Sequence, residues 1–138
     1  MVKRIMKNEI YNIEERTCNF GNITLRSDEI LTFKPFDTVT SVSLTDIEEM
    51  FSIFIEITKG VPHLYYSEYS KAIDIDSVTK AFVTEKMHHF AKAAAIKEDS
   101  AMVRFLTHSY IYLNRPKVTI KMFKTEEESI SWLKSLDI

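Results

Sequence analysis

The sequence predicts an α/β fold in which a mixed β-sheet is flanked by helices. In the first third of the chain, apolar and polar residues alternate on both sides of Ser27-Asp28, which is typical of an antiparallel hairpin. In the last third, residues 91–136 read strand, helix, strand, helix, the unit of a parallel sheet. These patterns predict antiparallel N-terminal strands followed by β-α-β-α-β-α units.

Three strands are expected at the N-terminal end. Residues 10–17 form a β-prone run, and segments 23–26 and 31–34 alternate with period two. Residues 1–8 are expected to be a loose or edge-pairing lead-in. The first helix is expected over 45–58, because Thr45 and Glu48 have the spacing of a capping box. Gly60 stands where a left-handed C-terminal cap is expected. The apolar residues that recur on one face of this helix are Ile47, Met50, Phe51 and Phe54.

Three further isoleucines make this helix apolar beyond the arc that one sheet face needs. They are Ile53, Ile55 and Ile57. Soluble monomers seldom leave such contiguous surface bare, so either the N-terminal strands or a second copy covers it. We expect a homodimer through this helix or the adjacent sheet edge, with coverage by the strands as the alternative.

Strands and helices alternate in the rest of the chain. Residues 61–66 are short, apolar and aromatic, as in a buried parallel strand, and a loop over 67–71 follows. Asp76 or Ser77 caps a helix over 78–90. Its expected buried stripe is Phe82, Val83, Met87 and Phe90.

The C-terminal part begins with an alanine-rich strand over 91–97, which a helix can approach closely. A helix over 100–113 comes next, then a strand over 118–123 and a closing helix over 125–136. The expected inner face of the helix over 100–113 consists of Met102, Leu106, Tyr110 and Leu113.

Length and composition narrow the class of protein. A chain of 138 residues suits one domain, so residues 1–138 are expected to form a single unit. The net charge of -2 does not favour binding to nucleic acid or to anionic lipid. With only two glycines, a Gly-rich phosphate loop is excluded.

The expected compartment is the cytoplasm. Cys18 is alone, which excludes an internal disulfide and suits a reducing compartment. Residues 1–7 are basic but lack the apolar run that a signal peptide requires. The longest apolar stretch, 50–57, is too short to span a bilayer. The sequence therefore predicts a soluble protein without a membrane span.

The default ligand site of such a fold is the crevice at the carboxyl ends of the parallel strands. The residues expected there are Tyr69, Lys71, Glu98, Ser100, Lys124 and Thr125. The alternative is that they belong to surface loops and helix caps. His88 and His89 are adjacent on a helix and point about 100° apart, so they cannot chelate one ion. We expect no metal site, no cofactor and no catalytic residues, and Cys18 as a half-buried strand residue.

Several C-terminal features occur together in an order typical of one protein group. They are the small-residue run Ala93–Ile96, the break Asn114-Arg115-Pro116, the strand end Lys121-Met122-Phe123 and the segment Glu127–Leu133. In this order they resemble the SpoIIAA-like group of bacterial proteins, over residues 9–138. That group is related to STAS domains and similar in shape to CRAL-TRIO lipid carriers. The resemblance implies a SpoIIAA-like mixed sheet with right-handed crossovers.

The resemblance also implies a candidate phosphorylation site. STAS-type anti-sigma antagonists carry an Asp-Ser pair at the start of a helix, and that serine is phosphorylated. Asp76-Ser77 is the matching pair here, although Val78-Thr79 stand where the family has Ser-Gly. A phosphate on Ser77 would meet the free N–H groups of a helix N-terminus. The alternative for Ser77 is a plain N-cap.

The expected function is that of a non-enzymatic, regulatory SpoIIAA/STAS-like module that binds a partner protein or a small ligand. The alternative is binding of a lipid or another apolar small molecule, which the carrier-like shape and the apolar stretch 50–57 suggest. An enzyme that uses the strand-end crevice is a third reading.

Overall fold

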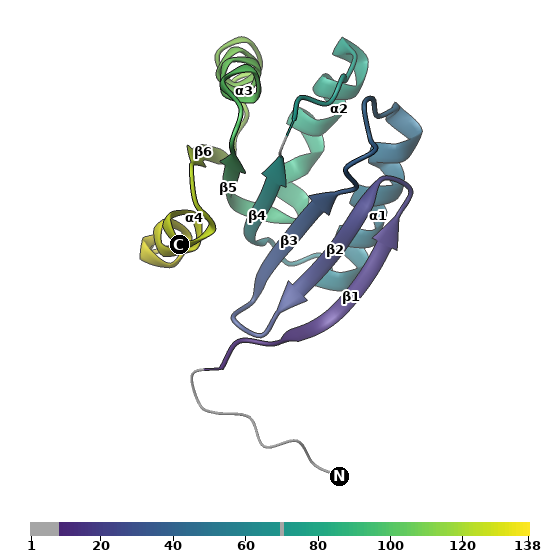
Figure 1. Ribbon diagram of the computed structural model, residues 1–138. Coiled ribbons are helices and arrows are strands. Elements are labelled where there is room, and N and C mark those ends of the chain that lie inside the picture. The colour runs from purple at the N-terminus through teal and green to yellow at the C-terminus, as the bar shows by residue number, and fades with distance from the viewer. Residues whose placement is uncertain (1–8, 70) are drawn as a thin grey trace.

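The computed structural model describes residues 9–69 and 71–138, so the expected lead-in over 1–8 and residue 70 of the expected loop lie outside the described residues. The described residues form one sheet flanked by helices (Figure 1), which confirms the expected α/β class. The strands are β1 (Asn12–Cys18), β2 (Gly21–Arg26), β3 (Ile30–Pro35), β4 (His63–Tyr69), β5 (Ala91–Glu98) and β6 (Thr119–Phe123). The helices are α1 (Leu44–Thr58), α2 (Ser77–Lys86), the short 3-10 helix η1 (Met87–His89), α3 (Ala101–Asn114) and α4 (Glu126–Ser135).

The strands lie in the sheet in the order in which they occur in the chain. The first three pair antiparallel, as the alternating pattern predicts, and β3 to β6 pair parallel. β4 is longer than expected, because Ser67, Glu68 and Tyr69 continue the pairing with β5 where a loop was expected. All four parallel strands therefore run in the same direction, and a helix follows each of their carboxyl ends.

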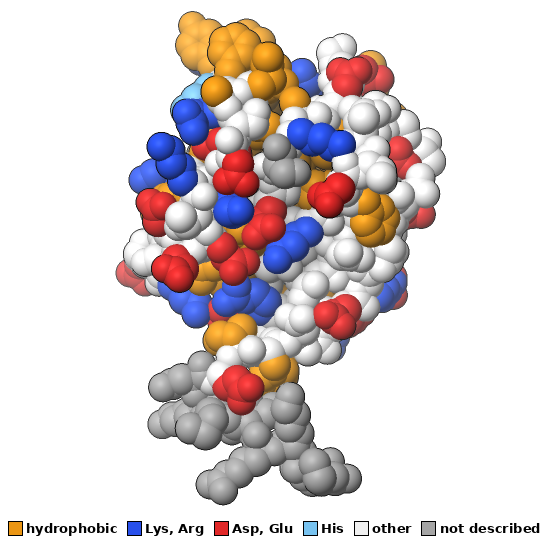
Figure 2. All heavy atoms as spheres, in the orientation of Figure 1, with side chains coloured by type: hydrophobic (Ala, Val, Ile, Leu, Met, Phe, Trp, Pro, Cys, Tyr) orange, Lys and Arg blue, Asp and Glu red, His pale blue; other side chains and the backbone are white. Residues whose placement is uncertain are grey.

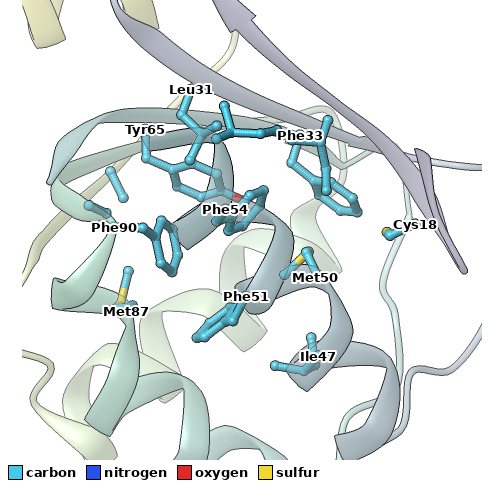
Figure 3. Close-up of a cluster of buried hydrophobic side chains, with 14 of the residues drawn as sticks. Cys18, Leu31, Phe33, Ile47, Met50, Phe51, Phe54, Tyr65, Met87 and Phe90 are labelled. Carbon is cyan, nitrogen blue, oxygen red and sulfur yellow. The ribbon is translucent and has the colours of Figure 1, made fainter. Parts of the chain in front are cut away.

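Side chains of the central strands alternate between two cores on opposite faces of the sheet. On one face, α1 and α2 cover Leu31, Phe33 and Tyr65 (Figure 3). On the other face, Leu133 of α4 packs against Tyr66. Figure 1 shows α4 on the side of the sheet opposite α1 and α2. Because Ala93 and Ala95 of β5 also face α4, the small side chains let this helix approach the sheet, as expected.

Helix caps agree only in part with the sequence patterns. The expected capping box of Thr45 and Glu48 is wrong: Ser43 is the N-cap of α1, and Asp46 completes the box. Either spacing fits the motif, and the start of the helix at Leu44 selects the earlier pair. At the other end, Lys59 itself forms the left-handed cap, with Gly60 also at positive φ behind it.

Much of the broad apolar surface of α1 packs against other elements of the chain. Ile57 is buried, and Ile53 and Ile55 are half-buried against the main core. The neighbours of α1 include α2 on one side and β1 on the other, where Arg16 of β1 pairs with Glu56 of α1 at 3.3 Å. β1, one of the N-terminal strands, therefore covers part of this surface and α2 covers another part, while Ile55 also borders an open hollow between α1 and α2. A homodimer through α1 stays a prediction.

The orientation of α3 is the largest departure from expectation. The predicted inner residues Met102, Leu106 and Leu113 are exposed, whereas Val103 is buried. Tyr110 does lie on the inner side, where its hydroxyl contacts Thr84 Oγ1 of α2 at 2.6 Å. The helix is thus turned so that its most apolar face points away from the sheet.

A charged cluster ties the β2–β3 turn to α4. The Asp28 carboxylate accepts hydrogen bonds from Arg26 Nε at 3.0 Å and Arg26 Nη2 at 2.7 Å, and it lies 2.9 Å from Lys134 Nζ. Burial opposes the charge on Asp28, but the hydrogen bonds from Lys134 and Arg26 outweigh it and hold the pKa of this carboxyl below its ordinary value.

We expect Asp28→Asn to lower the free energy of unfolding by about 1–3 kcal/mol at neutral pH, because two cations lose their partner. A carboxyl whose pKa is depressed on folding stabilises the fold above its ordinary pKa of 3.8, and that stabilisation is lost as pH falls through the folded pKa. Urea denaturation at several pH values should therefore show the variant converging with the wild type in acid. Asp137→Asn, at an exposed position, is the control. An equal loss at all pH values would point to packing instead of charge.

Candidate functional site

The carboxyl ends of the parallel strands bring the expected crevice residues to one edge of the sheet. Tyr69 ends β4 and Glu98 ends β5, and these two residues are paired in the sheet register. Ser100 and Thr125 are the N-caps of α3 and α4; their hydroxyl oxygens accept hydrogen bonds from the N–H groups of Val103 at 3.4 Å and Glu128 at 3.1 Å. Ser100 and Thr125 therefore act as helix N-caps, which is the alternative reading of these two residues from the sequence.

Glu98 is the most deeply placed of these side chains, with 2 % of its surface exposed. Its carboxylate accepts a hydrogen bond from Arg104 Nε at 3.0 Å, and Arg104 Nη2 lies 3.5 Å from the second oxygen. A buried carboxylate requires such a partner, because an unpaired charge in this position would be very costly. The pair fixes the first turn of α3 against the end of β5.

The remaining expected residues lie apart from this pair. Lys71 borders a small hollow of about 110 Å³ together with Lys34 and Glu68. Lys124 is exposed at the end of β6. Burial raises the pKa of the Tyr69 phenol, so this hydroxyl stays protonated at neutral pH. Of the hollows described in this subsection, only the one at Lys71 includes an expected residue, and ligand binding by the set of six stays a prediction.

The candidate phosphorylation site lies at the exposed start of α2. Asp76, the residue before it, is the N-cap, and its carboxylate accepts a hydrogen bond from the Thr79 N–H at 2.8 Å. Ser77 is the first residue of the helix, so the reading of Ser77 as the cap is wrong and Asp76 takes that role. Phosphorylation of Ser77 stays a prediction.

An open trough lies on the face of the antiparallel strands that none of the described helices covers. Its volume is about 930 Å³, and it runs from β1 to the start of α4. Lys34 Nζ is 3.7 Å from Glu68 and 3.9 Å from Glu126, and Tyr66 donates a hydrogen bond to Glu68 at 2.7 Å. Figure 2 shows acidic and basic side chains intermixed on this face. Because these charges neutralise one another, the trough carries no clear preference for an anion or a cation.

A second hollow, of about 370 Å³, lies between α1 and α2 and is mostly apolar. Its lining includes the rings of Phe51, Phe82 and Phe90, with Lys86 and His89 as the charged or titratable groups. Rings and aliphatic chains around a few polar groups are typical of sites for small apolar ligands.

The outer face of α3 is the most apolar exposed surface along the described helices. We define it by five side chains that are between 42 % and 76 % exposed: Met102, Phe105, Leu106, Tyr112 and Leu113. At 3.6 residues per turn, these five side chains fall within an arc of about 120° around the helix axis. Figure 2 shows hydrophobic side chains gathered at the top of the molecule, where Figure 1 places α3. The sequence shows these apolar residues, but the opposite face of α3 carries Val103 and Ile111, so the pattern alone does not say which face turns inward.

Three contacts hold α3 in this orientation. They are the Arg104–Glu98 ion pair, the Tyr110–Thr84 hydroxyl contact and the buried Val103. Turning the outer face inward would break the ion pair and leave Glu98 without its partner. The exposure of this face therefore follows from the buried carboxylate at the end of β5.

The side chains that could act as a nucleophile or a metal ligand include Cys18, His88 and His89. Burial raises the pKa of the Cys18 thiol, which keeps it protonated and a poor nucleophile. Cys18 is fully buried where half-burial was expected. The expected helix over 78–90 ends earlier, at Lys86, so His88 and His89 lie in η1, where their rings lie with centroids 4.2 Å apart instead of pointing about 100° apart. Among residues 9–69 and 71–138, no three side chains are placed to hold a metal ion together, and no helix is long and apolar enough to cross a bilayer.

The model of a domain of unknown function, DUF7793, matches residues 23–137, from β2 to just beyond α4. The chain belongs to the DUF7793 family. No curated protein matches this DUF7793 chain.

The DUF7793 chain is similar in structure to an uncharacterized protein of the DUF3478 family from Shewanella loihica PV-4, whose crystal structure has a SpoIIAA-like fold. The TM-score is 0.58 at 15 % sequence identity, over 96 % of this chain and 98 % of that one. At this identity the similarity concerns the fold alone. It confirms the SpoIIAA-like fold that the order of elements predicts.

Proposed function

We propose that the protein is a non-enzymatic binding module and that it docks a protein partner on the outer face of α3. The observation that carries this proposal is the exposure of five large apolar side chains on one side of a single helix. Contiguous apolar patches of several hundred Å² are uncommon on soluble monomers and mark interaction sites.

The shape of the face favours a protein over a small molecule. α3 has 14 residues, which corresponds to a rod about 21 Å long, and its apolar side chains stand out from a convex surface. A small ligand is bound by a concave site that surrounds it, whereas a helix face is bound by another helix or by a groove. Aromatic and Met side chains, which are three of the five, are also enriched in protein interfaces.

The non-enzymatic part of the proposal has separate support. Glu98 is paired with Arg104, and Cys18 is kept protonated by burial. Both groups thus have structural explanations that do not require an acid, a base or a nucleophile.

The hollow between α1 and α2 supports a second candidate function, the binding of a small apolar molecule. Its aromatic lining would contact an apolar body, and Lys86 and His89 would suit an acidic group at the opening. Native mass spectrometry of protein purified under gentle conditions tests this directly. A retained small molecule that is lost in Phe82→Glu would favour this function over docking at α3.

Photo-crosslinking tests the main proposal. A photoreactive amino acid replaces Ser109, at the centre of the outer face, and in a matched control it replaces Val78, an exposed apolar residue of α2. We expect a discrete protein adduct from position 109 in living cells, and its loss when Phe105→Glu is added. Phe105 and Val78 are 65 % and 64 % exposed, so Val78→Glu controls for adding a charge at an exposed apolar position. If position 109 yields no more adduct than position 78, the proposal is wrong.

A further inference from the structure

We propose that the partner on the outer face of α3 is a second copy of this chain, with the two α3 helices packed antiparallel about a two-fold axis. This inference rests on the proposed function and names its partner. It also replaces α1 as the expected dimer surface, since Ile53 and Ile55 of α1 are already packed against the core.

The spacing of the outer face suits a helix pair. Met102, Leu106, Ser109 and Leu113 recur at steps of four, three and four residues, which is the seam spacing of paired helices. An antiparallel pair centred between Thr107 and His108 places Met102 of one copy opposite Leu113 of the other. The same register places Leu106 opposite the small Ser109, twice by symmetry. Small residues at a helix crossing allow close approach, so each Leu106 has room beside the Ser109 of the other copy.

The charges at the ends of α3 select the antiparallel orientation. Asp99 precedes the helix, and Arg115 and Lys117 follow it; all three are exposed. In the register just described, Asp99 of one copy lies opposite Arg115 and Lys117 of the other. The helix dipoles then also run in opposite directions, which places positive and negative ends together. A parallel pair would bring like charges together at both ends.

The outer face itself carries no charged side chain, so it can meet its own copy without repulsion. Asp99 is already 3.7 Å from Lys97 within its own chain. We therefore assign the end charges a role in orientation more than in affinity.

The exposed apolar area of the outer face sets the expected affinity of the dimer. Five side chains at 42 % to 76 % exposure present on the order of 600 Å² of apolar surface per copy, which is somewhat below the roughly 800 Å² per partner of a standard interface. A two-fold pair uses this face twice, as isologous interfaces do. We expect a dimer with a dissociation constant in the micromolar range, so that the protein concentration determines whether the chain is monomeric or dimeric.

Sedimentation velocity of the purified full chain, from about 1 to about 100 µM, is the primary test. We expect a concentration-dependent dimer for the wild type and a monomer for Phe105→Glu and for Leu113→Glu. Both variants should keep the circular dichroism spectrum and the Tm of the dilute wild type, because the replaced side chains are exposed. Val78→Glu should still dimerise.

A charge swap tests the orientation. Asp99→Lys should weaken the dimer, as should Arg115→Glu combined with Lys117→Glu. Combining all three substitutions should restore the wild-type dissociation constant, because each copy again faces an opposite charge. If the triple variant is weaker than either parent, the helices are not antiparallel in this register.

The remaining outcomes separate the two proposals. A wild type that stays monomeric, together with a hetero-protein adduct at position 109 in cells, overturns the second copy and leaves the docking function standing. Monomer without any adduct overturns both. Cosedimentation of the wild type with phosphatidylcholine vesicles, lost in Phe105→Glu, assigns the face to a lipid surface and overturns both proposals.

Discussion

Phe54→Ala is expected to lower the free energy of unfolding by about 3–5 kcal/mol, the usual cost of emptying a buried aromatic site. Phe54 is 0 % exposed and lies where α1 meets the sheet (Figure 3). Its ring centroid is 4.6 Å from that of Phe90, 5.5 Å from Tyr65, 6.1 Å from Phe51 and 6.3 Å from Phe33. These four rings come from different elements, so they cannot all move inward to fill the space.

Equilibrium denaturation in urea measures this loss, with the slope of the transition checked against that of the wild type. Phe105→Ala removes the same atoms from an exposed position and is the matched control. Studied at a concentration where the chain is monomeric, it should change stability by less than about 0.5 kcal/mol. A loss below about 1 kcal/mol for Phe54→Ala would contradict its place at the centre of the core.

Gly21→Ala is expected to cost about 1–3 kcal/mol or more, because the added methyl group has no space. A Cβ on Gly21 would lie 2.6 Å from Cε1 and Cζ of Phe33 and 2.7 Å from the carbonyl oxygen of Lys34. The Phe33 ring is fully buried and packs edge-on against Phe20, and the carbonyl belongs to β3. Relief therefore requires a shift of two paired strands.

Gly60→Ala separates crowding from backbone conformation. Gly60 has φ of 74° and no atom within 4 Å of a Cβ position, so alanine there costs only the left-handed strain of about 1–2 kcal/mol. In the same denaturation assay, we expect Gly21→Ala to be at least as destabilising as Gly60→Ala, with a native-state change at Phe33 visible by NMR. An unperturbed Phe33 ring in Gly21→Ala would mean that β2 and β3 are farther apart than described.

The strands and the core could be predicted because their signals are local and repeated. The alternation of apolar and polar residues on both sides of Ser27-Asp28 predicts a hairpin without reference to the rest of the chain. The apolar stripe of α1, which includes Phe54, is expected to face the core for the same reason, and it does. The capping box of α1 was misplaced by two residues, because Thr45-Glu48 and Ser43-Asp46 fit the motif equally and only the chain's entry into the helix distinguishes them.

The residues of the candidate site could also be predicted only in part. Fold analogy alone brought Glu98 and Ser100 to the strand ends. The alternative reading, surface loops and helix caps, holds for Ser100, the N-cap of α3, but not for Glu98, which is buried and paired with Arg104. The outer face of α3 was not predictable from periodicity, because both sides of this helix carry apolar residues. Which side turns inward depends on Glu98, whose burial at the end of β5 draws Arg104 and fixes the rotation of α3.

The sequence by itself determined the α/β class, the order of strands and helices and the residues of the main core, since each of these follows from periodicity and local propensity. Only the tertiary structure decided that β1 and α2 pack against the flanks of α1 and that the described residues leave the outer face of α3 exposed. The physical reason is that exposure depends on which neighbours a helix has across the sheet and on how a buried charge finds its partner. Both are contacts between residues of different elements, which no local pattern contains.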